Sequence, residues 1–181
     1  MKKEFMAPHG RLTERHIQVL DRLAKGDTGP QTALVLGLTP TQVGTARLTC
    51  NKHIGVDGRS ALVHASYLLG ILARPAHAGP LPSTGVAVVD TDSDRVLELL
   101  ASGATGEQAA RRLQLSESAW WFRVGLLKVA TKAVSTHHLI TQGWRHHVLG
   151  PEHVHMTSGP PLVPAPRRPG PPSWPPRRSG R

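Results

Sequence analysis

Residues 26–55, GDTGPQTALVLGLTPTQVGTARLTCNKHIG, decide the fold because they contain two helix starts on either side of a glycine turn. Thr28 and Gln31 form a predicted capping box, in which the threonine hydroxyl accepts the Gln31 amide hydrogen and the Gln31 side chain reaches back. Pro30 lies in the first turn, where its missing N–H costs nothing. The pattern therefore predicts a short helix that ends at Gly37.

A longer helix is predicted directly after this turn. Thr39-Pro40 is a second cap with proline at the first helical position, and Gly55 is the expected stop. Val43, Cys50 and Ile54 have the spacing of a core-facing stripe. Two helices joined by a tight glycine turn are typical of a helix-turn-helix, whose second helix projects its first turns into the major groove of DNA.

One helix is predicted on each side of this pair. Thr13 is a good N-cap for the upstream helix and Gly26 a good stop, and its apolar residues share one face: Ile17, Leu20, Leu23 and Ala24. Downstream, Ser60 is the expected cap of a helix over residues 61–72. The sequence thus predicts a first four-helix domain over residues 11–73.

The same pattern recurs later in the chain. Leu20 returns as Leu97, an offset of 77 residues, and no gap is needed at that offset from Val19 to Leu72. Other identities at this offset are Val19/Val96, Leu23/Leu100, Gly26/Gly103, Thr28/Thr105, Gln31/Gln108, Ala33/Ala110, Leu36/Leu113, Leu38/Leu115 and Leu62/Leu139. We therefore predict a second, divergent domain over residues 89–150.

The second domain has its own set of helix signals. Asp90 or Asp92 is the expected cap of its first helix, and Thr105-Gly-Glu-Gln108 repeats the capping box of the second. Ser116 is the expected cap of a third helix that ends near residue 131, and Thr136 that of a fourth that ends near residue 149. The predicted fold class is all-α, with two tandem helix-turn-helix domains.

Composition separates the remaining segments. Residues 74–88 contain Pro75, Pro80 and Pro82 and are predicted to be a linker. Residues 151–181 hold ten of the sixteen prolines and five arginines, which predicts a disordered Pro/Arg-rich tail. Residues 1–10 are predicted to be a flexible N-terminus. The linker and both ends are expected to lie outside the two folded domains.

Charge favours a polyanionic partner. The 181 residues include 22 Lys and Arg against 12 Asp and Glu, a net charge of +10, and each phosphate that a cation neutralises releases counterions. Residues 11–74 carry eight basic and four acidic side chains, whereas residues 90–150 carry seven and six. The excess positive charge thus lies in the first domain and in the tail.

The remaining bulk features predict a cytoplasmic, nucleoid-associated protein. Cys50 is the only cysteine, which excludes an intrachain disulfide and fits a reducing compartment. No stretch approaches the ~20 apolar residues that span a bilayer, and no apolar segment follows Lys2 and Lys3, so we expect neither a membrane partner nor a signal peptide.

The first domain resembles the LuxR/GerE DNA-binding domain. The matching pattern covers about sixty residues without a gap and consists of Leu12-Thr13-x-Arg15, Val19-Leu20, Gly26, Gln31, Ala33, Leu36-Gly37-Leu38-Thr39, Val43, Gly55-Val56 and Arg59. The resemblance implies a four-helix domain, a third helix that reads DNA and a fourth that often dimerises. A region-4 sigma-factor domain has a related pattern, but the Gly55-Val56 ending is more similar to LuxR/GerE.

Candidate DNA contacts follow the third helix of each domain. Glutamine can pair with adenine, threonine and leucine can touch a thymine methyl group, and lysine or arginine can hold phosphates. These candidates are Thr41, Gln42, Thr45, Arg47, Leu48, Thr49, Lys52 and Arg59 in the first domain, and Arg123 and Lys128 in the second. Arg47 falls where the family usually has an apolar residue, so it is expected either to turn outward to a phosphate or to pair internally.

Departures from the family concern this same helix. The family usually has basic residues where this chain has Gly44 and Leu48 in the first domain, and Trp121 and Gly125 in the second. Trp120 takes the core position of the second domain, which leaves Trp121 and Phe122 on the outer surface, because adjacent helix residues cannot share a core face. An exposed aromatic pair marks a protein interface more often than a base contact, so we expect this surface to dock on the first domain, on a second copy of the chain or on another protein.

Two functions therefore remain open. The first is a transcriptional regulator whose first domain reads double-stranded DNA and whose fourth helices form a homodimer or an intramolecular pseudo-dimer. In the pseudo-dimer, Leu62, Leu68 and Leu69 would meet Leu139, Ile140 and Trp144. The second is an adaptor that binds RNA polymerase or another regulator. The predicted partner interface comprises Trp121, Phe122, Tyr67, Leu68 and Trp144.

Neither function requires a cofactor. Three histidine pairs, His137-His138, His146-His147 and His153-x-His155, lack the spacing of a metal site, and Asp, Glu or Cys ligands do not accompany them. A glycine-rich phosphate loop, a nucleophile elbow and paired catalytic acids are missing from the sequence, so we expect neither an enzyme nor a bound metal.

Overall fold

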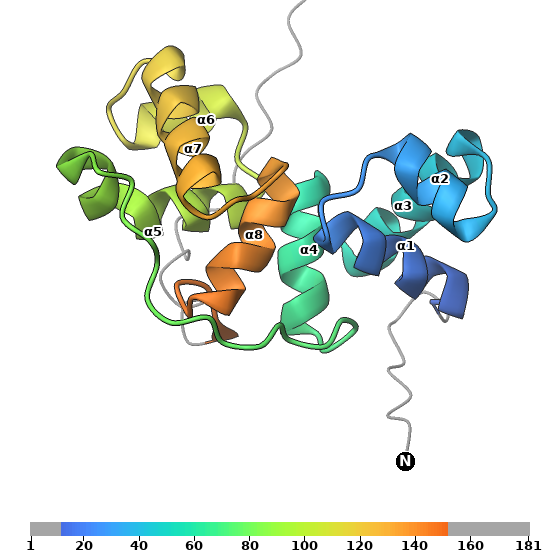
Figure 1. The fold of residues 1–181 in the computed structure, drawn as a ribbon. Coiled ribbons are helices and arrows are strands. Elements are labelled where there is room, and N and C mark those ends of the chain that lie inside the picture. The colour runs from blue at the N-terminus through green and yellow to red at the C-terminus, as the bar shows by residue number, and fades with distance from the viewer. Residues whose placement is uncertain (1–11, 152–181) are drawn as a thin grey trace, which may run out of the picture.

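A computed structural model describes residues 12–151, which form eight α-helices and contain no strand (Figure 1). The predicted flexible N-terminus and the predicted tail beyond Pro151 lie outside these residues. The helices are α1 (Glu14–Ala24), α2 (Gly29–Leu36), α3 (Pro40–Ile54), α4 (Arg59–Leu68), α5 (Ala87–Ala101), α6 (Gly106–Arg112), α7 (Glu117–Ala130) and α8 (Thr136–Arg145). The all-helical fold class is thereby confirmed.

The predicted capping boxes are present. The Thr28 hydroxyl accepts the Gln31 amide hydrogen at 3.4 Å, and the Gln31 side chain accepts the Thr28 amide hydrogen at 2.8 Å. Thr105 with Gln108 forms the same pair of bonds. Thr39 and Gln42, where only a cap was predicted, form a third such box. These reciprocal bonds satisfy backbone donors that a helix start otherwise leaves unpaired, so local sequence alone defines where α2, α3 and α6 begin.

Three helix starts differ from the prediction. The N-cap of α4 is Gly58 rather than Ser60, and that of α8 is Ser135 rather than Thr136. Helix α5 begins at Ala87, with Val86 as N-cap, rather than after Asp90 or Asp92. The Asp90 carboxylate instead accepts hydrogen bonds from the Ser83 and Thr84 hydroxyls and the Thr84 amide, and thereby fixes the chain that precedes α5.

Two helix ends lie earlier than predicted, at Leu68 instead of residue 72 and at Arg145 instead of residue 149. Gly70 and His147 have positive φ angles of 68° and 58°, which end a right-handed helix. The next two amides fold back to a single carbonyl in each case, that of Ser66 or that of Gly143. Leu72 and Leu149 are consequently buried in the core by the turn rather than by the helix.

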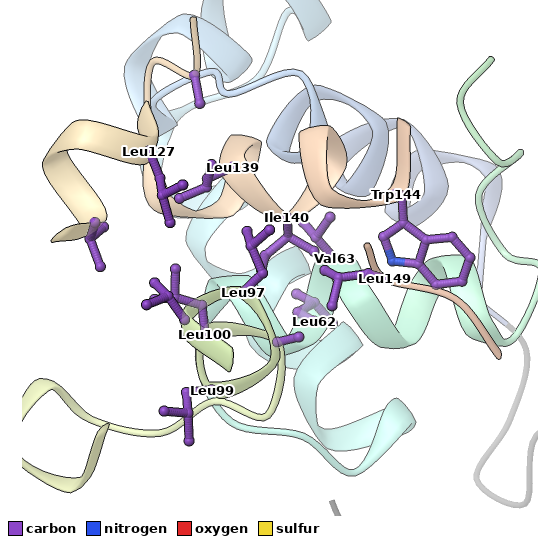
Figure 2. Close-up of a cluster of buried hydrophobic side chains, with 14 of the residues drawn as sticks. Leu62, Val63, Leu97, Leu99, Leu100, Leu127, Leu139, Ile140, Trp144 and Leu149 are labelled. Atoms are coloured by element: carbon purple, nitrogen blue, oxygen red, sulfur yellow. The ribbon is translucent and has the colours of Figure 1, made fainter. Parts of the chain in front are cut away.

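A large core joins both parts of the chain. Figure 2 shows Leu62 of α4, Leu97 of α5 and Ile140 of α8 converging in its centre, and all three side chains are fully buried. A second, smaller cluster forms where α1, α2 and α3 meet, and it consists of Val19, Ala33, Val43 and Ala46. The fold therefore has one shared core and one local core that positions α3.

The helix order is the same in the N-terminal half (α1–α4) and the C-terminal half (α5–α8). Shifting α2, α3 and α4 by 77 residues reproduces the first residues of α6, α7 and α8. The two halves meet along α4 and α8, which lie side by side in the centre of Figure 1. Helix α1 also packs on α8, and its counterpart α5 packs on α4, so the contacts between the halves are reciprocal.

The reciprocal packing includes two equivalent close contacts between the halves, each at a glycine. A Cβ added to Gly103 would lie 2.9 Å from the Asp57 carbonyl oxygen and 3.1 Å from the Ala61 Cβ. A Cβ added to Gly26 would collide with Val134 and lie 3.0 Å from the His138 Cβ. Because Asp57 and Val134, like Ala61 and His138, are 77 residues apart, the same close approach occurs twice with the halves exchanged.

Hydrogen bonds between the halves also join equivalent positions. The Trp144 indole donates to His64 Nδ1 at 3.1 Å, and the Tyr67 hydroxyl lies 3.2 Å from the Thr141 hydroxyl. Tyr67 corresponds to Trp144, and His64 to Thr141, at the offset of 77. The Tyr67 and Trp144 ring centroids are 5.5 Å apart. A pseudo-twofold axis therefore passes between these two rings.

The connection between the halves contacts the C-terminal end of α8. The Ala78 amide donates to the Arg145 carbonyl at 2.9 Å, and His146 Nδ1 lies 2.9 Å from the Gly79 carbonyl oxygen. The Arg74 guanidinium lies 5.4 Å from the centre of the Trp144 ring. Within residues 12–151, every helix is too short or too polar to cross a membrane.

Candidate nucleic-acid interface

Helix α3 is held against α2 by a short turn. Gly37 has a φ angle of 62°, and the Leu38 amide donates to the Ala33 carbonyl at 2.9 Å. A positive φ angle suits glycine because a Cβ would crowd the following carbonyl oxygen. Ala33 is small and buried where the two helices meet α1, so α3 packs closely on one side and keeps its other side free.

The inner and outer faces of α3 are clearly separated. Val43, Ala46 and Cys50 point into the cores, at the helical spacing of three and four residues. The outer stripe carries exposed side chains at Thr41, Thr45, Leu48 and Lys52, with Gln42 and Thr49 exposed beside it. The structure thus brings six of the eight predicted contacts of the N-terminal half onto one continuous surface.

This surface has a one-sided electrostatic character. Residues 28–56 contain no acidic side chain, whereas α3 carries Arg47, Lys52 and His53. The nearest acids in sequence are Asp27 and Asp57, at the two ends of the segment. A helix that offers hydroxyls and cations without carboxylates suits a polyanion, because no like charge opposes the approach of a phosphate.

Three of the predicted contacts differ from the others in their surroundings or position. Gln42 Oε1 accepts the Thr39 amide hydrogen at 2.8 Å, so only its Nε2 donor is free unless the cap opens. Arg47 is half-buried, and the ion pairs described for residues 12–151 do not include it. Arg59 is exposed in the first turn of α4, beyond the end of α3.

The C-terminal half requires a correction. Arg123 is not an outward DNA contact, because its side chain is buried and forms an ion pair with Asp92 of α5. Position 123 lies three residues after the fully buried Trp120, which places both side chains on the inner face of α7. Lys128 is half-buried near the end of the same helix. Of the two contacts predicted on α7, Arg123 is thus on the inner face and Lys128 is only partly accessible.

Apolar side chains occupy the outer face of α7 instead. Trp121, Phe122 and Val129 are 46%, 62% and 77% exposed, as expected for the two aromatic residues. The Trp121 indole donates to Glu117 Oε1 at 3.2 Å, and its ring borders Gly106 at the start of α6. This group is called the α7 apolar face below. Its exposure also shows that Trp121 and Phe122 do not dock on the N-terminal half.

The other predicted interface residues have a different place. Tyr67 and Trp144 are 5% and 4% exposed and meet each other between the halves, so they are closed to any external partner. Leu68 is half-buried against the shared core, and Leu69 is exposed beyond the end of α4. Tyr67, Leu68 and Trp144 thus belong to the intramolecular pairing of the halves and not to a surface for another protein, whereas Leu69 is not buried in this pairing as predicted.

Some residues of this interface were missed by the sequence reasoning. His64 and Thr141 are the hydrogen-bond partners of Trp144 and Tyr67 across the interface. A further missed partner, Asp92, binds Arg123 within the C-terminal half. The 77-residue offset already paired position 64 with 141 and 67 with 144. What it could not supply was the distance between the pairs, which depends on how the halves pack.

Burial changes the acid–base behaviour of three groups. It lowers the pKa of His64 to about 4, consistent with a neutral ring whose Nδ1 accepts the Trp144 indole hydrogen. It also lowers the pKa of His137 to about 4, with a smaller contribution from Arg59. Burial raises the pKa of the Cys50 thiol to about 11, so this cysteine is protonated and unreactive at neutral pH.

Residues 12–151 contain no cluster of three or more His, Cys, Asp or Glu side chains that could hold a metal ion. No family model matches the chain, and neither a curated protein nor a solved structure matches it significantly.

Proposed function

We propose that the chain binds double-stranded DNA through the outer face of α3 and acts as a transcriptional regulator. The observation that carries the proposal is the exposed stripe of Thr41, Thr45, Leu48 and Lys52 on a helix that is fixed by the Gly37 turn. In a helix-turn-helix of LuxR/GerE type, this stripe would face the major groove. The hydroxyls and the Leu48 side chain would meet base edges, and Lys52 would hold a phosphate.

The pairing of α4 with α8 supports this proposal. DNA-binding domains of LuxR/GerE type often dimerise through the fourth helix. In this chain the fourth helix of each half, α4 and α8, meets the other around Tyr67 and Trp144. A rigid pairing fixes the orientation of α3 relative to the rest of the molecule. Fixed orientation lowers the ordering cost of binding.

Fluorescence anisotropy with labelled duplex DNA tests the proposal. We expect the full chain to bind at low salt and to weaken steeply as salt rises, since phosphate contacts release counterions. Lys52→Ala should lower the slope of log affinity against log salt by about 1. The matched control is Arg95→Ala, which removes one exposed cation from α5 in the C-terminal half. The proposal is wrong if the chain fails to bind duplex DNA even at low salt.

A second candidate function has its own observation. The α7 apolar face would suit an adaptor that binds RNA polymerase or another regulator, since exposed aromatic groups are common in protein interfaces. Binding to purified bacterial RNA polymerase tests this alternative. Trp121→Ala should then abolish binding and leave DNA affinity unchanged, whereas Leu34→Ala, which shortens an exposed apolar side chain on α2, should have no effect.

A further inference from the structure

The surfaces through which the two halves pair are buried against each other within one chain. Tyr67 and Trp144 contact each other, and Leu62, Leu139 and Ile140 beside them are fully buried. The contacts exchange between the halves at Gly26 and Gly103, as in an isologous dimer interface. A second copy of the chain therefore cannot use α4 or α8 for pairing without opening the shared core.

The pseudo-twofold axis relates α3 to α7, so each outward position of α3 has a counterpart on α7. Thr45 corresponds to Phe122, and Lys52 to Val129, at the offset of 77. In these two pairs the N-terminal member is polar and the C-terminal member is an exposed apolar side chain, whereas Thr41 corresponds to the polar Ser118. The fold is thus nearly symmetric, whereas the two outer faces differ in chemistry.

The α7 face has little with which to recognise base edges. Phe122 and Val129 lack hydrogen-bonding groups, and the Trp121 indole N–H is bonded to Glu117. The Ser118 hydroxyl is paired with the Ser116 hydroxyl at 3.0 Å. In addition, the exposed Glu117 carboxylate would repel DNA phosphates. Base recognition in the grooves depends mainly on donors and acceptors, and this face presents few of them.

From these observations, and resting on the proposed DNA binding, we infer that one chain binds one asymmetric DNA site, of which only the half under α3 is read by sequence. The ligand class is duplex DNA with a single informative half-site. It is not the inverted repeat that a symmetric helix-turn-helix dimer recognises, with half-site centres about 10 bp apart. The C-terminal half takes the place of the second subunit of a dimer but does not contact the bases.

Selection from a randomised duplex library with the full chain tests the inference, together with light scattering of the free protein and of the complex. We expect one sequence block shorter than a helical turn, about 10 bp. We also expect a free mass of one 19.5 kDa chain and one chain per duplex. An inverted repeat, two chains per site or a stable dimer of the free protein would overturn the inference while DNA binding itself stands. A failure to bind any duplex would instead remove the proposed function, and the inference with it.

A matched pair of variants identifies the face that reads DNA. Thr45→Ala should weaken binding to the selected duplex about fivefold, the value of one net hydrogen bond. Phe122→Ala changes the equivalent position of α7, and we expect its affinity to stay within twofold of the unchanged chain. Thermal unfolding should show that both variants are folded. An equal loss for the two variants would mean that α7 also contacts the bases, and the asymmetric-site inference would then be wrong.

Discussion

Replacing single glycines by alanine measures how tightly the two halves fit. Gly55 and Gly103 have the same φ angle of 78°, so alanine suffers the same left-handed backbone penalty at both positions, about 1–2 kcal/mol. Their surroundings differ. Among the described residues nothing lies within 4 Å of a Cβ at Gly55, whereas a Cβ at Gly103 meets the Asp57 carbonyl oxygen at 2.9 Å.

The difference between these two variants isolates the contact between the halves. Overpacking in a well-packed region costs about 1–3 kcal/mol, and a backbone oxygen cannot rotate away as a side chain can. We therefore expect Gly55→Ala to lower the free energy of unfolding by about 1–2 kcal/mol. Gly103→Ala should lower it by about 2–5 kcal/mol, the sum of the two costs.

Urea unfolding monitored by circular dichroism gives both values, provided that the m-value is unchanged between the variants. Gly26→Ala, the pseudo-symmetric counterpart, should fall between them, because its main obstacle is the side chain of Val134, which is exposed and can move. Equal losses for Gly55→Ala and Gly103→Ala would refute the close approach of α4 to the loop after α5, and with it the reciprocal packing of the halves.

Three further predictions concern buried groups. Arg123→Ala should lower the free energy of unfolding in urea by about 2–3 kcal/mol. This loss is near the lower end of what removing one partner of a buried ion pair costs, because Asp92 keeps some contact with water. The variant should keep the DNA affinity of the unchanged chain. If the folded variant lost DNA affinity, Arg123 would be a DNA contact after all. Because burial holds the pKa values of His64 and His137 near 4, the unfolded chain takes up protons first as the pH falls below about 6.5. The free energy of unfolding should therefore be nearly constant between about pH 7 and 8 and decrease between about pH 6.5 and 4. His64→Gln should reduce this decrease, and urea midpoints at the two ends of the range measure it. Finally, since burial raises the pKa of Cys50 to about 11, Ellman's reagent should react with it only after unfolding, and rapid reaction of the native protein would show that α3 opens locally.

Local chemistry explains which parts of the fold could be predicted. Thr28, Thr39 and Thr105 each form two hydrogen bonds within three residues, so their helix starts do not depend on the rest of the protein. The start of α5 was misplaced because Asp90 has the residue type of a cap but binds Ser83 and Thr84 of the preceding loop. A residue's preference for capping does not say which neighbour competes for its side chain.

The candidate site shows the same division. The outer position of Thr45 and Lys52 follows from their spacing relative to Val43, Ala46 and Cys50, and helical periodicity is visible in the sequence. Arg123 also obeys this periodicity, and the spacing from Trp120 places it inside. Its charge favours a phosphate contact, but its position relative to Trp120 favours burial. A buried arginine is acceptable only beside a carboxylate, and Asp92 lies on another helix that the linear pattern could not bring near.

The contrast between the pairing surface and the outer faces argues for two separate tasks in one chain. Gly26 and Gly103 make the same close approach, and Tyr67 and Trp144 donate or share hydrogen bonds at equivalent places. Substitutions that merely drifted on an exposed helix would be expected to leave polar groups, because large exposed apolar side chains promote association. Phe122 is large, apolar and 62% exposed at the position where α3 presents a threonine. The packing between the halves therefore requires both halves to stay alike, whereas the proposed DNA recognition would require only α3 and would leave the α7 apolar face available for a different contact.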